Sequence, residues 1–135
     1  MKNSFTVNAV FPVPPSKLFS AWLSSKEHSA FTGSPAKITA KTGGKFSAWD
    51  GYISGTTTQM VKDKKIVQKW RTTEFPDESP DSLVTIEFEK AKGGTKLILT
   101  HSEIPQGQAR EYKQGWEDYY FKPLREYFSK VLESK

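Results

Sequence analysis

Apolar residues alternate with other residues through much of the chain, as they do in strands that bury one face. In the segment 5–11 every second side chain is apolar, so these side chains share one face that we expect to point inward. A proline-rich stretch ends this strand, because proline has no backbone N–H to donate to a sheet. The segment 16–23 then carries Leu18, Phe19 and Trp22 at helical spacing, which predicts a short amphipathic helix.

Glycine pairs and polar turns divide the middle of the chain into hairpins. Gly43-Gly44 separates strand-like residues 36–40 from 45–49, and a lysine-rich loop separates 52–61 from 66–71. A third hairpin turns at Gly93-Gly94, between alternating residues 84–89 and 97–101. With no internal repeat and no low-complexity linker, residues 1–135 are expected to form a single domain around one antiparallel meander.

From about Ala109 the apolar period changes to three and four residues, which predicts a long helix. A helix over residues 109–132 would span about 36 Å, enough to cross a curved sheet. Pro123 cannot donate to the carbonyl of Tyr119, so we expect a bend there. The stripe of this helix consists of Tyr112, Trp116, Tyr119, Tyr120, Leu124, Tyr127 and Val131.

The composition narrows the classes of protein further. The 135 residues include no cysteine, which excludes disulfides, thiolate metal sites and cysteine nucleophiles. Twenty Lys/Arg against fifteen Asp/Glu give a net charge of +5, but the basic residues are scattered among acidic ones, so no nucleic-acid partner is expected. No stretch is apolar and long enough to insert into a membrane, and the N-terminus lacks a secretion signal. We therefore expect a soluble, unprocessed, cytoplasmic protein.

Six sequence fragments, in this order, resemble the activator of heat-shock protein 90 ATPase homologue family within the START-like (SRPBCC) superfamily. The resemblance covers about residues 4–128, and the family name associates it with the stress response. It implies an α+β helix-grip fold, in which a curved antiparallel sheet of about seven strands wraps around the long C-terminal helix and two short helices follow the first strand. The fragments are Phe11-x-Val13-x-x-Ser16-Lys17-Leu18-Phe19-x-Ala21-Trp22, Gly43-Gly44-Lys45-Phe46, Gly51-Tyr52-Ile53-Ser54-Gly55, Ile66-Val67-Gln68-Lys69-Trp70-Arg71, Gly94-Thr95-Lys96-Leu97 and Gly115-Trp116.

This resemblance implies more than one function. Related folds bind lipids, hormones or polyketides, whereas the eukaryotic namesake assists a chaperone ATPase. That namesake has two domains, and this chain resembles its C-terminal module alone. Fold alone does not choose between these functions.

The chain lacks the usual motifs of catalysis and cofactor binding. No Gly-x-Ser-x-Gly turn is present, and Phe46 occupies the position where a phosphate loop beginning Gly43-Gly44-Lys45 would need Ser or Thr. His28 and His101 lie on different predicted elements, without the spacing that would direct both imidazoles to one metal ion. We therefore expect no metal, no cofactor and no enzymatic activity as the leading hypothesis.

Aromatic side chains provide the strongest indication of a binding function, because apolar pockets are lined by such rings. The leading hypothesis is a small apolar ligand, lipid-like or aromatic, enclosed between the sheet and the C-terminal helix. An empty cavity of about 300 Å³ would cost about 7 kcal/mol, so side chains, water or a ligand must fill the space beneath the helix. Alternation does not decide between Phe46 and Trp49 as the inward residue. The candidate ligand-binding residues are Phe31, Phe46, Trp49, Trp70, His101, Trp116, Tyr119 and Tyr120.

Two alternative functions use other residues. Lys69 and Arg71 flank Trp70 on the opposite strand face, where they could bind an acidic surface of a chaperone or be solvated edge residues. His101 shares the inward face of its strand, and Glu103 follows two residues later, so a weak cyclase-like or hydrolase-like enzyme would use this pair. The other interpretation of His101 is a buried histidine hydrogen-bonded to a neighbouring backbone group or to water. The sequence does not identify the ligand, the oligomeric state or the pathway.

Overall fold

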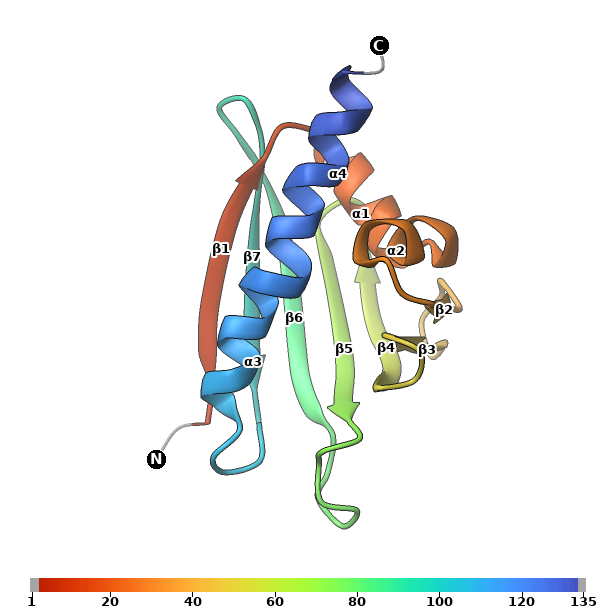
Figure 1. Ribbon diagram of the computed structural model, residues 1–135, viewed down its shortest axis with the longest axis vertical. Coiled ribbons are helices and arrows are strands. Elements are labelled where there is room, and N and C mark those ends of the chain that lie inside the picture. Colours follow the sequence, from red (N-terminus) through yellow and green to blue (C-terminus); the bar gives the residue numbers. More distant parts are fainter. Residues whose placement is uncertain (1–2, 134–135) are drawn as a thin grey trace.

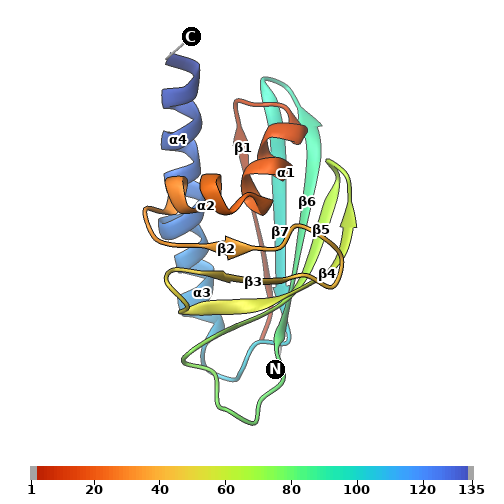
Figure 2. The same ribbon diagram turned by 90° about the vertical axis from the view of Figure 1, so that its right-hand side faces the viewer.

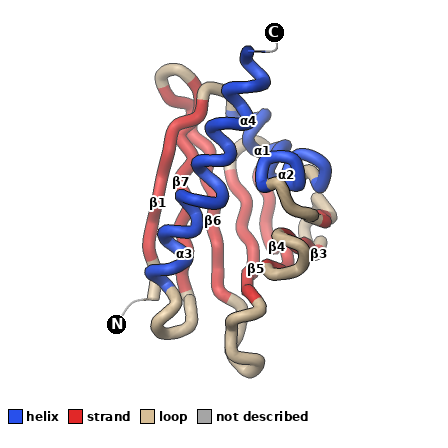
Figure 3. The backbone as a smooth tube through the Cα atoms, viewed as in Figure 1, coloured by secondary structure: helices blue, strands red, loops and turns tan. Residues whose placement is uncertain are grey.

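A seven-stranded antiparallel sheet forms the main layer of the molecule, and helices cover one of its faces (Figures 1 and 3). The computed structural model describes residues 3–133, with side chains described up to residue 129. The strand order is β1-β7-β6-β5-β4-β3-β2. The strands are β1 (Phe5–Phe11), β2 (Lys37–Ile38), β3 (Lys45–Ala48), β4 (Ile53–Val61), β5 (Lys65–Thr72), β6 (Ser82–Ala91) and β7 (Gly94–Ser102).

Alternation along the strands sets which side chains face the helices. In β1, Ala9 and Phe11 are buried whereas Val10 between them is half exposed, which confirms the predicted inward face. The first strand pairs with β7 from Phe5 opposite His101 to Phe11 opposite Thr95. Gly94 begins β7 where a Cβ atom would lie 1.9 Å from the Phe11 carbonyl oxygen, so only glycine fits at this junction.

Two short helices follow β1, as predicted. Pro15 occupies the first turn of α1 (Pro15–Leu23), where its missing N–H has no intrahelical partner to lose. The second helix, α2 (Ser25–Thr32), begins with the Ser24 side chain accepting a hydrogen bond from Glu27 N–H at 3.1 Å, and ends at Gly33 with a φ of 76°. Leu18 and Trp22 of α1 are buried against the sheet.

A side chain of α2 closes the edge of the sheet at β2. The Ser25 hydroxyl accepts a hydrogen bond from Ile38 N–H at 2.8 Å and donates to Ile38 O at 3.3 Å. One side chain therefore satisfies backbone groups that an edge strand would otherwise leave open to pairing with another chain.

The long C-terminal helix consists of α3 (Ala109–Trp116), a π-helical turn η1 (Glu117–Phe121) and α4 (Lys122–Glu133). Lys122 N–H donates to the Glu117 carbonyl, five residues back, as in a π turn. Pro123, which has no backbone N–H, thus follows directly after a turn that already departs from α-helical hydrogen bonding. The helix continues past Pro123 across the concave face of the sheet (Figures 1 and 2).

The π turn changes which side chains are buried. Tyr120 and Phe121 are both buried although they are adjacent in sequence, and Phe128 is buried further along. Tyr119 is 58% exposed, so its predicted place on the buried stripe is wrong. The prediction assumed an unbroken α-helical period, whereas one extra residue in a turn rotates the side chains after it. The side chain of Val131, also assigned to the stripe, lies outside the described residues.

The sheet curves so that β3 and β4 approach the C-terminal helix from the side opposite β1 (Figure 2). This arrangement confirms the predicted α+β helix-grip fold with its curved sheet and long final helix. The hydrophobic core lies in the trough between the helices and the concave face. Its fully buried apolar side chains include Phe11, Leu18, Ile66, Val84, Ile86, Leu97, Leu99, Phe121 and Leu124.

Candidate functional site

Aromatic rings fill the trough beneath the C-terminal helix. The Trp22 ring lies 5.0 Å from that of Tyr120 and 6.0 Å from that of Trp116, and Trp70 lies 5.5 Å from Trp116 on the other side, measured between ring centroids. The void left among these rings and Phe46 is about 10 Å³, about the space for one water molecule. The sequence left open whether side chains, water or a ligand fill the space beneath the helix. In the structure, aromatic side chains fill it.

Beside this filled interior, an open groove of about 670 Å³ lies between the C-terminal helix and the turn that joins β3 to β4. Its floor is formed by buried rings such as Trp70 and Trp116, and its walls by Tyr119 and Tyr52, which are exposed. This volume is within the range of pockets that bind small molecules. The residues that line it are Trp49, Tyr52, Ile53, Trp70, Glu111, Tyr112, Gln114, Gly115, Trp116, Asp118, Tyr119 and Tyr120.

The candidate ligand-binding residues separate into two groups. Phe31 and Phe46 belong to the packed interior, and His101 lies behind the groove, in contact with the rings of Trp70 and Trp116. The other five candidates line the groove; they are Trp49, Trp70, Trp116, Tyr119 and Tyr120.

Sequence reasoning missed most of the polar lining of the groove. Glu111, Gly115 and Asp118 lie four and three residues apart, so they share one side of the C-terminal helix. That spacing is visible in the sequence, but only the position of the β3–β4 turn shows that this side faces a groove.

Trp49 is held in the groove by an unusual turn. Phe46 points into the core from β3, whereas Trp49 comes after the end of that strand. Alternation along the strand therefore could not decide which of the two side chains faces inward. Trp49, Asp50 and Gly51 have φ values of 54°, 55° and 90°. The left-handed region costs a bulky L-residue about 1–2 kcal/mol. The turn directs the half-buried Trp49 ring against Tyr119, with ring centroids 5.6 Å apart and an edge-to-face geometry.

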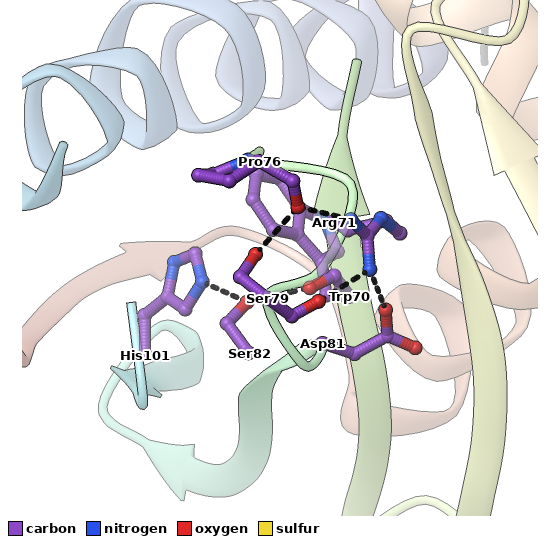
Figure 4. A network of polar contacts seen from close by, with 7 residues as sticks. All are labelled: Trp70, Arg71, Pro76, Ser79, Asp81, Ser82 and His101. Carbon is purple, nitrogen blue, oxygen red and sulfur yellow. Dashed lines mark hydrogen bonds and ion pairs between the residues drawn. The ribbon is translucent and has the colours of Figure 1, made fainter. Parts of the chain in front are cut away.

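His101 belongs to a fully hydrogen-bonded buried network (Figure 4). Trp116 Nε1–H donates to His101 Nδ1 at 3.1 Å, and because an indole nitrogen can only donate, Nδ1 carries no proton. The proton is therefore on Nε2, which donates to Ser82 Oγ at 2.8 Å, and Ser82 donates in turn to the Trp70 carbonyl at 2.6 Å. Burial lowers the pKa of His101 to about 3, so the ring is neutral at pH 7.

This geometry does not give the acid/base pair that the enzymatic alternative requires. The His101 side chain has no exposed surface, and both of its nitrogens have partners. Glu103 lies in the turn after β7, with a φ of 59° and an exposed side chain. His101 is instead a buried histidine hydrogen-bonded to the side chains of Ser82 and Trp116, where the sequence interpretation had a backbone group or water as the partner.

His28 is a second neutral buried histidine, and it ties the three helical segments together. Its Nδ1 lies 2.9 Å from the Trp22 carbonyl oxygen, so Nδ1 must carry the proton and donate. Its Nε2 accepts from the Tyr120 hydroxyl at 2.8 Å. Burial lowers the pKa of His28 to about 4, although the bond to Trp22 opposes this shift. The two histidines thus hold opposite tautomers.

Of the two candidate partner-binding residues, only Lys69 projects freely. Arg71 donates to Asp81 Oδ1 at 2.9 Å and to the carbonyls of Ser79 and Pro76 at 3.1 Å (Figure 4), and its guanidinium lies 5.4 Å from the centre of the Phe75 ring. This side chain organises the loop between β5 and β6. Lys69 is exposed on the outer face of β5.

The described part of the chain contains neither a cluster of metal ligands nor a membrane-spanning helix. Among residues 3–129, whose side chains are described, no group of three or more His, Asp or Glu side chains is placed to hold a metal ion. No helix within residues 3–133 is long and apolar enough to cross a membrane.

The fold and the groove define a helix-grip domain of the START-like class. Residues 12–129 match the family model described as Activator of Hsp90 ATPase homolog 1-like protein. The chain belongs to that family, as its sequence fragments predicted.

Named relatives and solved structures that are similar to this chain support the same family assignment. The human activator of 90 kDa heat shock protein ATPase homolog 1 is 34% identical over 123 residues, which cover 91% of this chain and 36% of the human protein. The crystal structure of an HSP90 activator from Plasmodium falciparum superposes with a TM-score of 0.87 at 34% identity, and the match covers 93% of this chain and 96% of that one. A protein from Mesorhizobium loti shares the fold alone, at 21% identity and a TM-score of 0.78 over 94% of this chain and 97% of its own. This chain spans about a third of the human relative's length.

Proposed function

We propose that this domain binds an Hsp90-type chaperone and stimulates its ATPase. The observation that carries the proposal is the similarity to the Plasmodium HSP90 activator at 34% identity, since that match covers nearly all of both chains. The filled interior also favours a role for the outer surface over one for an enclosed cavity.

The outer face of the sheet offers a surface for such a partner. In the described structure the helices pack on the concave side, which leaves the convex side uncovered (Figure 2). Lys45 and Lys69 are exposed there, and both pair with Thr56 from opposite sides in the strand register. Two strand spacings place these lysine backbones about 10 Å apart. Two exposed lysine side chains on this face suit an acidic surface on a partner.

The test measures the ATPase rate of the cognate Hsp90 while this domain is titrated, with the background removed by an ATP-competitive inhibitor of the chaperone. We expect the rate to rise and saturate, and Lys45→Glu with Lys69→Glu to weaken the interaction by about tenfold. Lys92→Glu, in the exposed turn between β6 and β7, is the matched control, because it makes the same charge change away from this face. Arg71 is unsuitable for this test because its loss would disorganise a loop.

Binding and stimulation need separate measurements, because the human relative is about three times longer than the matched region. Calorimetric titration of the chaperone with the domain reports binding alone. Binding without stimulation would restrict the function to docking. Absence of both at concentrations of tens of micromolar would refute the proposal.

A second proposal is that the domain binds a small molecule, and the open groove of about 670 Å³ favours it. The ligand would contact the rings that line this groove, not the packed interior around Phe31 and Phe46. Native mass spectrometry of the freshly purified protein tests this proposal, since a retained small molecule adds its mass to that of the chain. Loss of that added mass on Tyr119→Ala, which removes an exposed ring at little cost in folding, would locate the ligand in the groove.

A further inference from the structure

The groove beside the C-terminal helix combines an apolar surface with a local charge opposite to that of the whole chain. The charged residues among its lining are Glu111 and Asp118; the described lining includes no lysine or arginine. The chain as a whole carries a net charge of +5. An aromatic groove with an acidic wall on a basic protein favours cations over anions.

The two carboxylates flank a gap on the helix surface. Glu111 and Asp118 are seven residues apart, which places them about 10 Å apart along the helix, and Gly115 lies between them on the same side. A Cβ atom at Gly115 would meet nothing closer than the Tyr119 ring at 3.8 Å, so the space above this glycine is open. Gln114 donates to Asp118 Oδ1 at 3.0 Å and holds that carboxylate in place.

This separation is wrong for a metal ion but suitable for a larger cation. A metal ion needs its oxygen ligands within about 2.0–2.6 Å, which two carboxylates about 10 Å apart cannot provide together. An ammonium or guanidinium group carrying an apolar body is larger, and it is attracted both to carboxylates and to the faces of aromatic rings. Trp49 and Tyr119 supply such rings on the exposed side of the groove.

The turn at Trp49 forms the side of the groove opposite the helix. Trp49 is half buried: it packs partly against the core and edge-to-face against Tyr119, and it also lines the groove. The turn thus places an aromatic ring across the groove from the acidic side of the helix.

We propose that the groove binds a small organic cation, with its charged group above Gly115 between Glu111 and Asp118 and its apolar or aromatic body against Trp49 and Tyr119. The inference rests on the proposal that the groove binds a small molecule, and it names the chemical class. It is independent of chaperone binding through the outer face of the sheet.

Three probes of similar size test the class of ligand. Benzyltrimethylammonium carries a cation, benzyl alcohol is neutral and phenylacetate is an anion, and all three have one benzene ring. Binding is followed by the indole N–H signals of Trp49, Trp70 and Trp116 in two-dimensional NMR and by calorimetry. We expect the cation to shift these signals and to bind at least about fivefold more tightly than the other two.

Variants locate the charged group. Glu111→Gln with Asp118→Asn removes both charges and should weaken binding of the cation about fivefold. Gly115→Leu fills the gap while keeping both carboxylates and should weaken it at least about tenfold. Glu126→Gln is the matched control, because Glu126 is exposed on α4 and does not line the groove. Thermal unfolding of each variant verifies that the domain remains folded.

The possible failures are distinguishable. Equal binding of the three probes would retain a small-molecule groove but overturn the assignment of a cation. No binding of any probe at about 10 mM would overturn both proposals about the groove. A tripeptide, acetyl-Phe-Arg-Phe-amide, that binds more tightly than every small cation tried would identify a peptide as the occupant and overturn the proposal as stated.

Discussion

Acidification from about pH 7 to pH 5 should destabilise this domain, because two buried histidines are neutral in the folded protein. Burial holds the pKa of His28 at about 4 and that of His101 at about 3, whereas both are near 6.5 in an unfolded chain. Below about pH 6.5 the unfolded chain therefore binds two protons that the folded protein does not. Stability is complete above that pH and falls as the pH decreases towards the folded pKa values.

The size of this effect follows from the two shifts. Each histidine that is protonated only in the unfolded chain lowers the free energy of unfolding by about 1.4 kcal/mol per pH unit. Between about pH 7 and pH 5 this amounts to about 1.9 kcal/mol for each ring and about 4 kcal/mol for both. Since domains of this size are stable by about 5–15 kcal/mol, the change is a large fraction of the total.

Urea unfolding followed by tryptophan fluorescence, at constant ionic strength and several pH values, measures this dependence. We expect a slope of about 2.5 kcal/mol per pH unit near pH 5.5, and about half of that slope in His28→Asn or in His101→Gln. Imidazole ¹⁵N shifts in the folded protein should show the proton on Nδ1 of His28 and on Nε2 of His101. Constant stability between pH 7 and pH 5, or folded-state titration of either ring near pH 6.5, would refute the reasoning.

Four further substitutions test the local structure, and each is measured by urea unfolding unless another method is named. Gly115→Ala should stabilise the domain by about 0.5–1 kcal/mol because the glycine is inside a helix and has open space beside it, whereas Gly55→Ala should prevent folding because its Cβ would lie 1.8 Å from a backbone oxygen of β5; an unchanged stability in either would contradict this. Ser25→Ala should cost about 1–3 kcal/mol, since it leaves backbone groups of β2 without partners, and a neutral result would mean that water replaces the hydroxyl. Arg71→Ala should speed amide hydrogen exchange in the loop 73–81 with little effect on exchange in β7, and unaltered loop exchange would exclude the organising role.

Most of the fold could be predicted because its signals are local. Apolar residues alternate with other residues in 5–11 and 84–89, because one side of each strand faces the core and side chains of a strand point alternately to its two sides. Glycine pairs mark the turns between such strands. The short helix with Leu18 and Trp22 follows in the same way. These features need no knowledge of distant parts of the chain.

The site was harder to predict because it depends on where distant elements meet. The rings of Trp22, Trp116 and Tyr120 come from segments about a hundred residues apart, and the sequence does not show whether they fill a cavity or surround it. Arg71 has the alternation of a surface residue, yet a loop that comes after it supplies its partners. The burial of Phe121 and the exposure of Tyr119 depend on the π turn, which hydrophobic periodicity alone does not reveal.

The π turn at Glu117–Phe121 has a consequence for how such domains diversify. It separates α3, which presents its side chains to the groove, from α4, whose Leu124 and Phe128 anchor the helix in the core. Substitutions in α3 can therefore remodel the groove without realigning α4 in the core. Deletion of one residue within the turn would swing α4 by about 100° and withdraw both anchoring side chains from the sheet.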